Sequence, residues 1–398
     1  MKICIIGGGT TGWMCAAYME RNLPDHEITL IESDNIPIIG VGESTLPMIK
    51  TFFDDMGLDE ADWMPEANAI HKIGNIKQGW TQPFDDEFPF TFWYNDNNVF
   101  DHWVKDYFNN KKHKLDINDD LYVGGSGTVA YHMDAEQAGQ VLRRRCTRVN
   151  HIIDTIEELP TGYDLYIDCT GFARRFVKDK STTVPPHHLV NSAWVCPYQL
   201  DKHESYTRSI ARSNGWQFII GLTNRIGTGY VFSDKYISDD DALEDFKNFN
   251  SHRKPFEDRA PRLLKWTPEF LTNPWTDNVV AIGLANGFLE PLDSNALFMT
   301  QFQITQLVKC IKRGYGSNTY NKASRMMWIQ NHEYLYHHYA LSDRIDSEFW
   351  RYYASHDVRE SLWENYKKRG NKYTQLFPDN AWATLALYFD EFTYYEKK

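Results

Sequence analysis

The sequence has few of the features that mark a secreted, membrane-spanning or metal-binding protein. Its six cysteines form no C-x-x-C pair and show no spacing typical of a disulfide framework or a metal site: Cys4, Cys15, Cys146, Cys169, Cys196 and Cys310. The fourteen histidines also show no metal-ligand spacing. No apolar run approaches the roughly 18 residues that a membrane span needs, and the apolar residues 3–6 run directly into glycines rather than forming a signal peptide. We therefore expect a soluble, cytoplasmic protein with reduced cysteines and no metal.

A concentration of positive charge is also missing. The net charge is −12, the isoelectric point is near 5.6, and basic residues occur only in short clusters such as residues 143–145. This distribution argues against nucleic acid or an anionic membrane as a partner. What is present is enough apolar sequence, 42% of 398 residues, to bury a large core divided into two or three lobes.

The first thirty-two residues carry the clearest motif. A short β-branched run leads into Gly7-x-Gly9-x-x-Gly12, an apolar-periodic helix follows from Trp13, and Glu32 ends a second predicted strand twenty residues after Gly12. Such glycines permit a tight turn and a close approach to a pyrophosphate, which meets the free N–H groups of the helix start, while the acid can accept the ribose hydroxyls. The order of these features predicts a dinucleotide site.

Two further stretches favour FAD over NAD. The glycine-rich residues 36–47 follow the acidic residue at once, which suits a loop crossing a flavin, and residues 163–172 read as a distant strand ending in Asp-Cys-Thr-Gly. A competing Gly125-x-Gly127-x-x-Ala130 could bind a second nucleotide such as NADPH. A new helix start at Asp134 leaves no complete strand-turn-helix unit around those glycines, so a second site is disfavoured.

Two carboxylates lie in an apolar stretch that follows a predicted buried strand. Glu290 and Asp293 lie in the apolar run GFLEPLDSNALF, directly after a predicted buried strand at residues 278–285. Carboxylates close to a core need partners or a function, because burying an unpaired charge is costly.

Taken together, eight stretches resemble the flavin-dependent halogenases, especially the tryptophan-halogenase type. The stretches occur in the family's order, from residue 3 to about residue 353: GGGTTGWMCAAYM, IESDNIPIIGVGESTLP, WMPEANAIHKIG, AYHMDAEQ, DLYIDCTGF, GWQFIIGLTNRIGTGYVFS, NVVAIGLANGFLEPLDSNAL and HHYALSDRIDSEFW. The resemblance implies a two-component oxidoreductase in which FADH2 and oxygen convert a halide (chloride, bromide or iodide) to hypohalous acid. The acid then halogenates an aromatic or heteroaromatic small molecule.

The resemblance also assigns roles to individual residues. Lys72 is the lysine that receives the hypohalous acid, either as an ammonium donor or as a haloamine-forming amine. Asp293 is its carboxylate partner and the acceptor of the ring proton, and Ser294 is a hydrogen-bonding group beside it. The backbone N–H groups of Asn295 and Ala296 form the halide site. Glu290 is expected to hold the loop in place.

The motif and the resemblance together predict a set of cofactor contacts. They are Gly7, Gly8, Gly9, Thr10, Thr11, Gly12, Trp13, Glu32, Ser33, Ile36, Val41, Ser44, Leu284 and Leu297. Since no convincing NAD(P)H site is present, the implied partner is a separate flavin reductase. The oligomeric state, including a homo-oligomer, is left open.

The chain departs from the family at two places. Asp293 replaces the usual glutamate, and Asn295-Ala296 replace Thr-Gly. In the segment expected to separate flavin from substrate, Trp216 is kept, but Phe218 and Gly221 replace a tryptophan and a proline. These changes keep two alternatives open: a flavin-dependent aromatic monooxygenase, and a non-catalytic flavin-binding protein.

The predicted fold is α/β, a Rossmann-type flavoprotein of the aromatic-monooxygenase type with a second β-sheet and C-terminal helices. We expect residues 1–398 to form one compact unit. The expected FAD lobe comprises residues 1–50, 125–175 and 272–325, and the substrate lobe residues 51–124 and 176–271. Residues 326–398 are expected to be helical.

Overall fold

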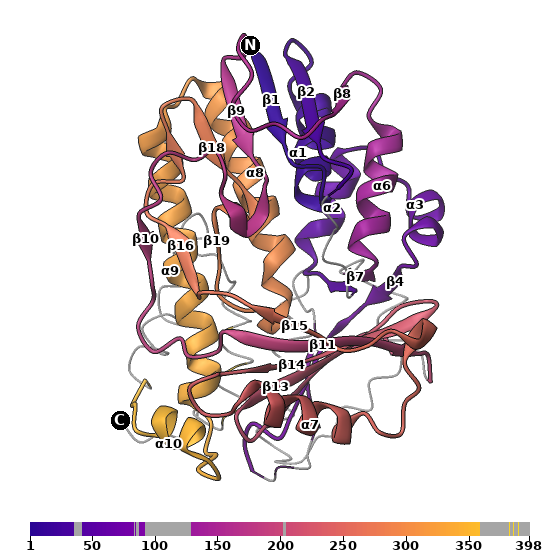
Figure 1. Ribbon diagram of the computed structural model, residues 1–398, viewed down its shortest axis with the longest axis vertical. Helices are drawn as coiled ribbons and strands as arrows, with labels where there is room; N and C mark the ends of the chain where they lie inside the picture. The colour runs from indigo at the N-terminus through magenta and orange to yellow at the C-terminus, as the bar shows by residue number, and fades with distance from the viewer. Residues whose placement is uncertain are drawn as a thin grey trace, which may run out of the picture.

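The computed structural model describes residues 1–35, 42–82, 84, 87–91, 129–201 and 204–358, together with positions 382, 385 and 389. Two large sheets occupy opposite ends of the molecule, and the helices α8 (Asn295–Arg313) and α9 (Ser317–Ala340) run alongside them (Figure 1). The predicted α/β architecture with a second sheet is confirmed. Among the described residues no helix is both long and apolar enough to cross a membrane.

The N-terminal sheet has six strands in the order β17-β18-β9-β1-β2-β8. Their bounds are β1 (Lys2–Ile6), β2 (Glu27–Glu32), β8 (Asn150–Ile153), β9 (Leu165–Asp168), β17 (Trp275–Thr276) and β18 (Val279–Ala281). All neighbours are parallel except β17 and β18. The run KICII of β1 is buried beyond its first residue, as expected for a parallel strand covered on both faces.

Helices pack on this sheet through one contiguous core. α1 (Thr10–Asn22) follows the glycine loop, and α6 (Ala135–Arg145), α2 (Met48–Asp55) and α3 (Glu60–Glu66) join it. The predicted helix start at Asp134 is confirmed, because its carboxylate accepts the N–H groups of Glu136 and Gln137. That cap satisfies two donors that a helix start otherwise leaves unpaired.

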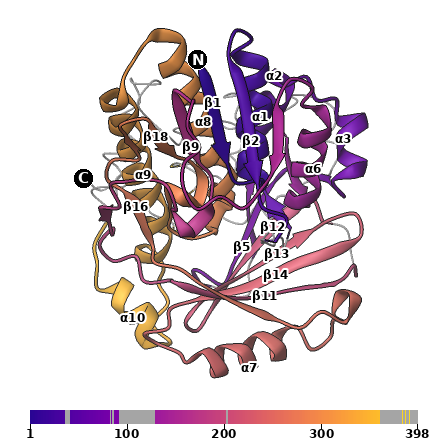
Figure 2. The same cartoon turned by 45° about the horizontal axis from the view of Figure 1, so that its top comes forward.

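The second sheet has seven strands in the order β15-β11-β14-β13-β12-β5-β6. Their bounds are β5 (Gly74–Gln78), β6 (Glu87–Thr91), β11 (Ser192–Gln199), β12 (Tyr206–Arg212), β13 (Gly215–Gly221), β14 (Arg225–Phe232) and β15 (Arg262–Lys265). The pairing is antiparallel except between β12 and β5. α7 (Asp239–Phe249) covers one face (Figure 2), and every residue of β13 is buried.

Two small sheets and short helices complete the described structure. One sheet joins β3 (Glu43–Ser44), β7 (Ala130–Met133) and β4 (Ile70–Lys72), and the other joins β10 (Thr182–Thr183), β16 (Glu269–Leu271) and β19 (Gly287–Phe288). Single 3-10 turns occupy Gly171–Ala173, Phe256–Asp258, Gly283–Ala285 and Leu292–Ser294, and α10 (Glu348–Ala354) follows α9. The β3-β7-β4 sheet places Ser44, His132 and Lys72 on adjacent strands.

The described elements divide differently from the predicted lobes at two points. α2, which crosses the expected boundary at residue 50, and α3, expected in the substrate lobe, pack in the core of the N-terminal sheet. There Phe52 stacks on Tyr18 with 4.6 Å between the ring centroids. The predicted boundary at residue 326 falls inside α9, whose buried residues continue across it. Gly125 and Gly127 of the competing nucleotide motif lie outside the described residues.

Candidate active site

A cavity of about 770 Å³ lies at the carboxyl ends of the parallel strands. This is the edge at which open α/β sheets bind their ligands. Nine of the residues predicted to contact the cofactor line it: Gly7, Gly8, Gly9, Thr10, Thr11, Glu32, Ser33, Leu284 and Leu297. The predicted halide residues, Asn295 and Ala296, line it as well.

The glycine loop leaves room for a phosphate group. A Cβ added at Gly9 would meet no atom within 4 Å, whereas one at Gly7, whose φ is +112°, would lie 2.5 Å from the carbonyl oxygen of Cys169. α1 begins at Thr10, and no side chain caps it, so its first N–H groups remain available. The open position at Gly9 and the helix start therefore fit a pyrophosphate.

Glu32 lies at the end of β2 on the cavity wall. Its carboxylate is 2.7 Å from His151 Nε2 and 3.4 Å from an Arg143 guanidinium nitrogen, and a Cβ at Gly8 would overlap it. This position suits an acceptor for ribose hydroxyls. Arg143 also lines the cavity and was missed by the sequence reasoning, although it stands in the last turn of the helix after the predicted start at Asp134.

Three residues that were predicted to contact the cofactor lie away from the cavity and contact other parts of the protein. Gly12 lets α1 pack on the loop, because a Cβ there would lie 1.8 Å from the Gly7 carbonyl oxygen. Trp13 is buried, with its ring 5.1 Å from that of His151, and Ser44 bonds to Thr207 and Ser294. None of the three lines the cavity. Ile36 and Val41 lie outside the described residues.

The loop before α8 has an uncommon backbone. Asp293 and Ser294 are consecutive non-glycine residues in the left-handed region, with φ of 58° and 63°. Asn295 helps to hold this turn, since its Nδ2 donates to the Leu292 carbonyl at 3.0 Å. Ala296 lies in the first turn of α8 without a positive φ, so the change from glycine to alanine brings no backbone strain.

Lys72 ends β4 and is fully buried. Its Nζ donates to Ser294 Oγ and to the Thr45 carbonyl oxygen, both at 2.9 Å. Burial lowers the pKa of Lys72 well below its usual range; the charge of Asp293 opposes this effect and that of Lys77 adds to it. The structure thus presents an amine that gives up its proton easily.

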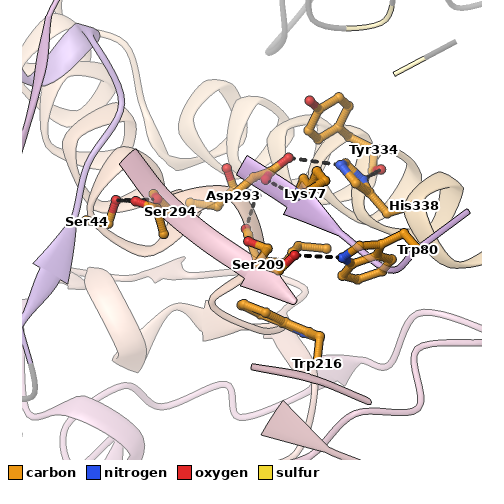
Figure 3. Close-up of polar contacts among 12 residues, drawn as sticks. Ser44, Lys77, Trp80, Ser209, Trp216, Asp293, Ser294, Tyr334 and His338 are labelled. Atoms are coloured by element: carbon orange, nitrogen blue, oxygen red, sulfur yellow. Dashed lines mark hydrogen bonds and ion pairs between the residues drawn. The ribbon is translucent and has the colours of Figure 1, made fainter. Parts of the chain in front are cut away.

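Asp293 has a different direct partner from the predicted one. Its Oδ1 is bonded to the Nζ of Lys77 in β5, and its Oδ2 lies 3.0 Å from His338 Nε2 in α9 (Figure 3). Burial alone would raise the pKa of Asp293, but Lys77 and His338 hold it well below its usual value. Sequence reasoning missed Lys77 and His338, although Lys77 stands only five residues after Lys72.

Glu290 connects the loop to the second sheet and to α9. The side chain is 2% exposed, and its Oε2 accepts hydrogen bonds from Trp216 Nε1 at 2.9 Å and the Tyr339 hydroxyl at 2.7 Å. Trp216 and Phe218 are buried side by side on β13, with ring centroids 6.1 Å apart. These bonds support the predicted role of Glu290 in holding the loop.

The fold is that of an α/β protein of the Rossmann type, and the cavity at its strand ends fits a dinucleotide. Comparison with known proteins makes this specific, because the sequence profile of the tryptophan halogenase family matches residues 2–390. The chain therefore belongs to the tryptophan halogenase family and is a flavin-dependent halogenase, an oxidoreductase.

Individual relatives agree with this assignment. The tryptophan 6-halogenase SttH of Streptomyces toxytricini is 29% identical, over 92% of this chain and 83% of its own length. The tryptophan 7-halogenase RebH of Lentzea aerocolonigenes is 29% identical, over 88% of this chain and 78% of its own. The structure of Xcc4156, a flavin-dependent halogenase from Xanthomonas campestris, superimposes with a TM-score of 0.84 at 26% identity, covering 98% of this chain and 88% of that one.

Proposed function

We propose that the protein uses FADH2, oxygen and a halide to halogenate an aromatic or heteroaromatic small molecule through Lys72. One observation carries the proposal. The loop before α8 presents Asn295 and Ala296 to the dinucleotide cavity, while its preceding residue, Ser294, is bonded to the buried amine of Lys72. A single short loop therefore connects the place where a halide would be oxidised with the lysine that would carry the electrophile.

The cavity residues fit FAD and a halide. The glycine loop and the start of α1 would hold the pyrophosphate, and Glu32 would accept the ribose hydroxyls. The N–H groups of Asn295 and Ala296 lie at the positive end of the α8 dipole. Backbone N–H groups there attract an anion such as a halide without the need for a charged side chain. When bound, FADH2 would supply two of the four electrons that reduce oxygen, and the halide would supply the other two as it becomes hypohalous acid, with water as the second product.

The side chains beyond the loop would complete the halogenation. The halogen leaves oxygen, or the Lys72 nitrogen, and forms a carbon–halogen bond, while the carbon–hydrogen bond breaks and its electron pair returns to the ring. Asp293 is ionised by its contacts with Lys77 and His338. We propose that this carboxylate stabilises the positive charge of the ring and takes its proton.

The test is product analysis with a panel of indoles, phenols and heteroaromatics, incubated with the protein, FAD, a flavin reductase and NADH. Chloride, bromide, iodide and no halide are compared, with catalase present. Halogenated product that requires both a halide and Lys72 would support the proposal. Halogenation that is unchanged in Lys72→Ala would contradict it.

A flavin-dependent monooxygenase is the second candidate. Gly221 stands where the family has proline, and a more pliable end of β13 would favour direct oxygen transfer to the substrate. The same assay separates the two, because hydroxylated product formed without halide and retained in Lys72→Ala would identify the monooxygenase. The buried pair Trp216 and Phe218 favours the halogenase.

A further inference from the structure

Two thiols meet beside the dinucleotide cavity. The sulfur atoms of Cys15 and Cys169 lie 4.0 Å apart, in a contact in which either thiol can donate. Cys15 lies in α1 and is fully buried, whereas Cys169 follows β9, is half-buried and lines the cavity. All six cysteines of the chain are free thiols, so this pair is reduced in the structure. The proposed halogenation uses neither sulfur.

A disulfide between these two cysteines needs only a short approach. The sulfur atoms of a disulfide lie about 2.05 Å apart, so the pair would have to close by about 2 Å. Cys169 faces the cavity, and Cys15 lies behind it in the core, 154 residues away in the chain. An accessible cysteine that is oxidised first, with a second thiol next to it, is the usual arrangement of a reversible protein disulfide.

The flavin chemistry of the family supplies an oxidant at this position. Hydrogen peroxide forms when oxygen takes the two electrons of a reduced flavin and no halide captures the oxidising equivalents. Because Cys169 lies on the wall of the cavity that fits the cofactor, peroxide released there meets its sulfur before it reaches the surrounding solution.

We propose that hydrogen peroxide joins Cys15 and Cys169 in a disulfide, and that this disulfide weakens the binding of FAD. The Cys169 sulfur attacks one peroxide oxygen, the O–O bond breaks, and a sulfenic acid and one water form. The Cys15 sulfur then attacks the Cys169 sulfur, the S–O bond breaks, and the hydroxyl group leaves as a second water with the thiol proton of Cys15. Two thiols lose two electrons in total, and one peroxide becomes two waters. The inference rests on the use of a flavin and not on the role of Lys72.

The pair is expected to respond to accumulated peroxide and not to traces. The hydrogen bond with Cys15, together with burial, raises the pKa of Cys169 well above its usual range. The neutral thiol therefore predominates at neutral pH, and the thiolate is the form that attacks peroxide. Cys169 should thus stay reduced while halide consumes the oxidising equivalents and react when the halide runs out.

The disulfide would disturb the glycine loop because Cys169 touches that loop directly. A Cβ at Gly7 would lie 2.5 Å from the Cys169 carbonyl oxygen, and the Cys169 N–H donates to the Ile6 carbonyl oxygen at 2.8 Å. The turn after β9 is itself held, since Asp168 Oδ1 accepts the N–H of Thr170 at 3.0 Å. The approach of the two sulfur atoms therefore displaces the glycine loop and the start of α1, which fit the pyrophosphate.

The first test is a search for the cross-link. The FAD-free protein is treated with hydrogen peroxide in stepped concentrations, quenched with catalase, denatured, alkylated and digested with trypsin without reductant. We expect the linked peptides of Cys15 and Cys169 to become the main form of both and to separate again with dithiothreitol. Fragment ions must assign the link to Cys15, because Cys4 lies in the same tryptic peptide.

Cys146 is the internal reference for this digest, because it is also half-buried but does not line the cavity. It should remain open to alkylation at peroxide concentrations that link the pair. A digest without the cross-link, or a loss of Cys146 at the same rate as that of Cys169, would overturn the proposal.

The second test measures the consequence for the cofactor by flavin fluorescence titration. After removal of peroxide, the cross-linked protein should bind FAD about tenfold more weakly than the reduced protein, and dithiothreitol should restore the affinity. Cys15→Ala, which cannot form the link, should have the same affinity before and after peroxide. If Cys15→Ala does not fold, Cys169→Ala takes its place.

Equal affinities of the cross-linked and reduced wild type would overturn the proposal. So would an equal loss in Cys15→Ala, because it would assign the effect to another oxidised side chain. Neither test needs a halide, an aromatic substrate or Lys72. A protein that passes both but halogenates nothing would contradict the proposed function alone, and a protein that halogenates through Lys72 but forms no cross-link would contradict this inference alone.

Discussion

Asp293 is paired directly with Lys77, whereas the neighbouring Ser294 is bonded to Lys72. Two buried lysines of the same β-rich segment thus meet consecutive residues of one loop. The left-handed backbone at both loop positions turns these two side chains toward different partners. The two lysines are therefore expected to respond differently to mutation.

Lys72→Ala is expected to reduce halogenation about 100-fold or more while the fold is kept, because the group that carries the electrophile is lost. Lys72→Arg should be almost as inactive, since a guanidinium stays charged and offers no reactive lone pair. Product formation per minute with a saturating flavin reductase is the measurement, and Lys50→Ala, at a half-buried surface position of α2, is the control. Substantial activity in Lys72→Arg would instead favour an ammonium donor.

Lys77→Met is expected to destabilise the protein by about 3–5 kcal/mol, because it leaves a buried carboxylate without its cation. Lys77→Arg, which keeps the charge, should lose less. Denaturant unfolding at neutral pH measures both variants. A cost for Lys77→Met as small as that of a surface substitution would contradict the buried pair.

The same variant should change the pH dependence of activity. The pKa of Asp293 is held low by Lys77, so the stability that this pair supplies is present above the pKa of the unfolded state and is lost as the pH falls through the folded value. Without Lys77 the pKa of Asp293 rises, and the acidic limb of the kcat profile should move to higher pH. An equal loss of kcat at every pH would show that Lys77 has only a structural role.

Gly9→Val is expected to weaken FAD binding at least about tenfold without changing the melting temperature of the FAD-free protein. The backbone at this position, with φ of −69° and ψ of 179°, accepts a branched side chain, and a Cβ there meets no atom within 4 Å. Flavin fluorescence titration measures the affinity. Gly316→Val, which also meets no neighbour, is the control, and a matching loss of affinity there would argue against the predicted pyrophosphate position.

Glu43 lines the cavity, and burial, together with the charge of Asp134, raises its pKa to about 7. A raised pKa means that its contribution to stability is complete below the unfolded pKa and is lost as the pH rises through about 7. The free energy of unfolding of Glu43→Gln, relative to that of the wild type, should therefore increase by about 2 kcal/mol from pH 5 to pH 8. Urea unfolding of the FAD-free protein at the two pH values tests this, with the exposed Glu158→Gln as the control. Parallel curves for wild type and Glu43→Gln would contradict it.

The local features of the site were predictable from the sequence. The strand, glycines, helix and acid of the first 32 residues predict the nucleotide end of the cavity, because a tight turn, a helix start and a strand end depend on residues close together in the chain. The resemblance to the halogenase family predicted the catalytic role of Lys72 and the halide-binding role of the loop before α8. The carboxylates inside an apolar run predicted that some partner must exist for each.

The identity of those partners came from the tertiary structure alone. Lys72 and Ser294 are 222 residues apart, Lys77 and Asp293 are 216 apart, and His132 and Gly221 are 89 apart. Pairing across such distances depends on strand order and register, and a shift of one residue in a strand would turn its side chains to the opposite face. The amino-acid sequence by itself determined the fold of the cofactor-binding lobe and the chemical groups of the site. Which loop residue meets which lysine was decided only when β4 and β5 came together around the loop before α8.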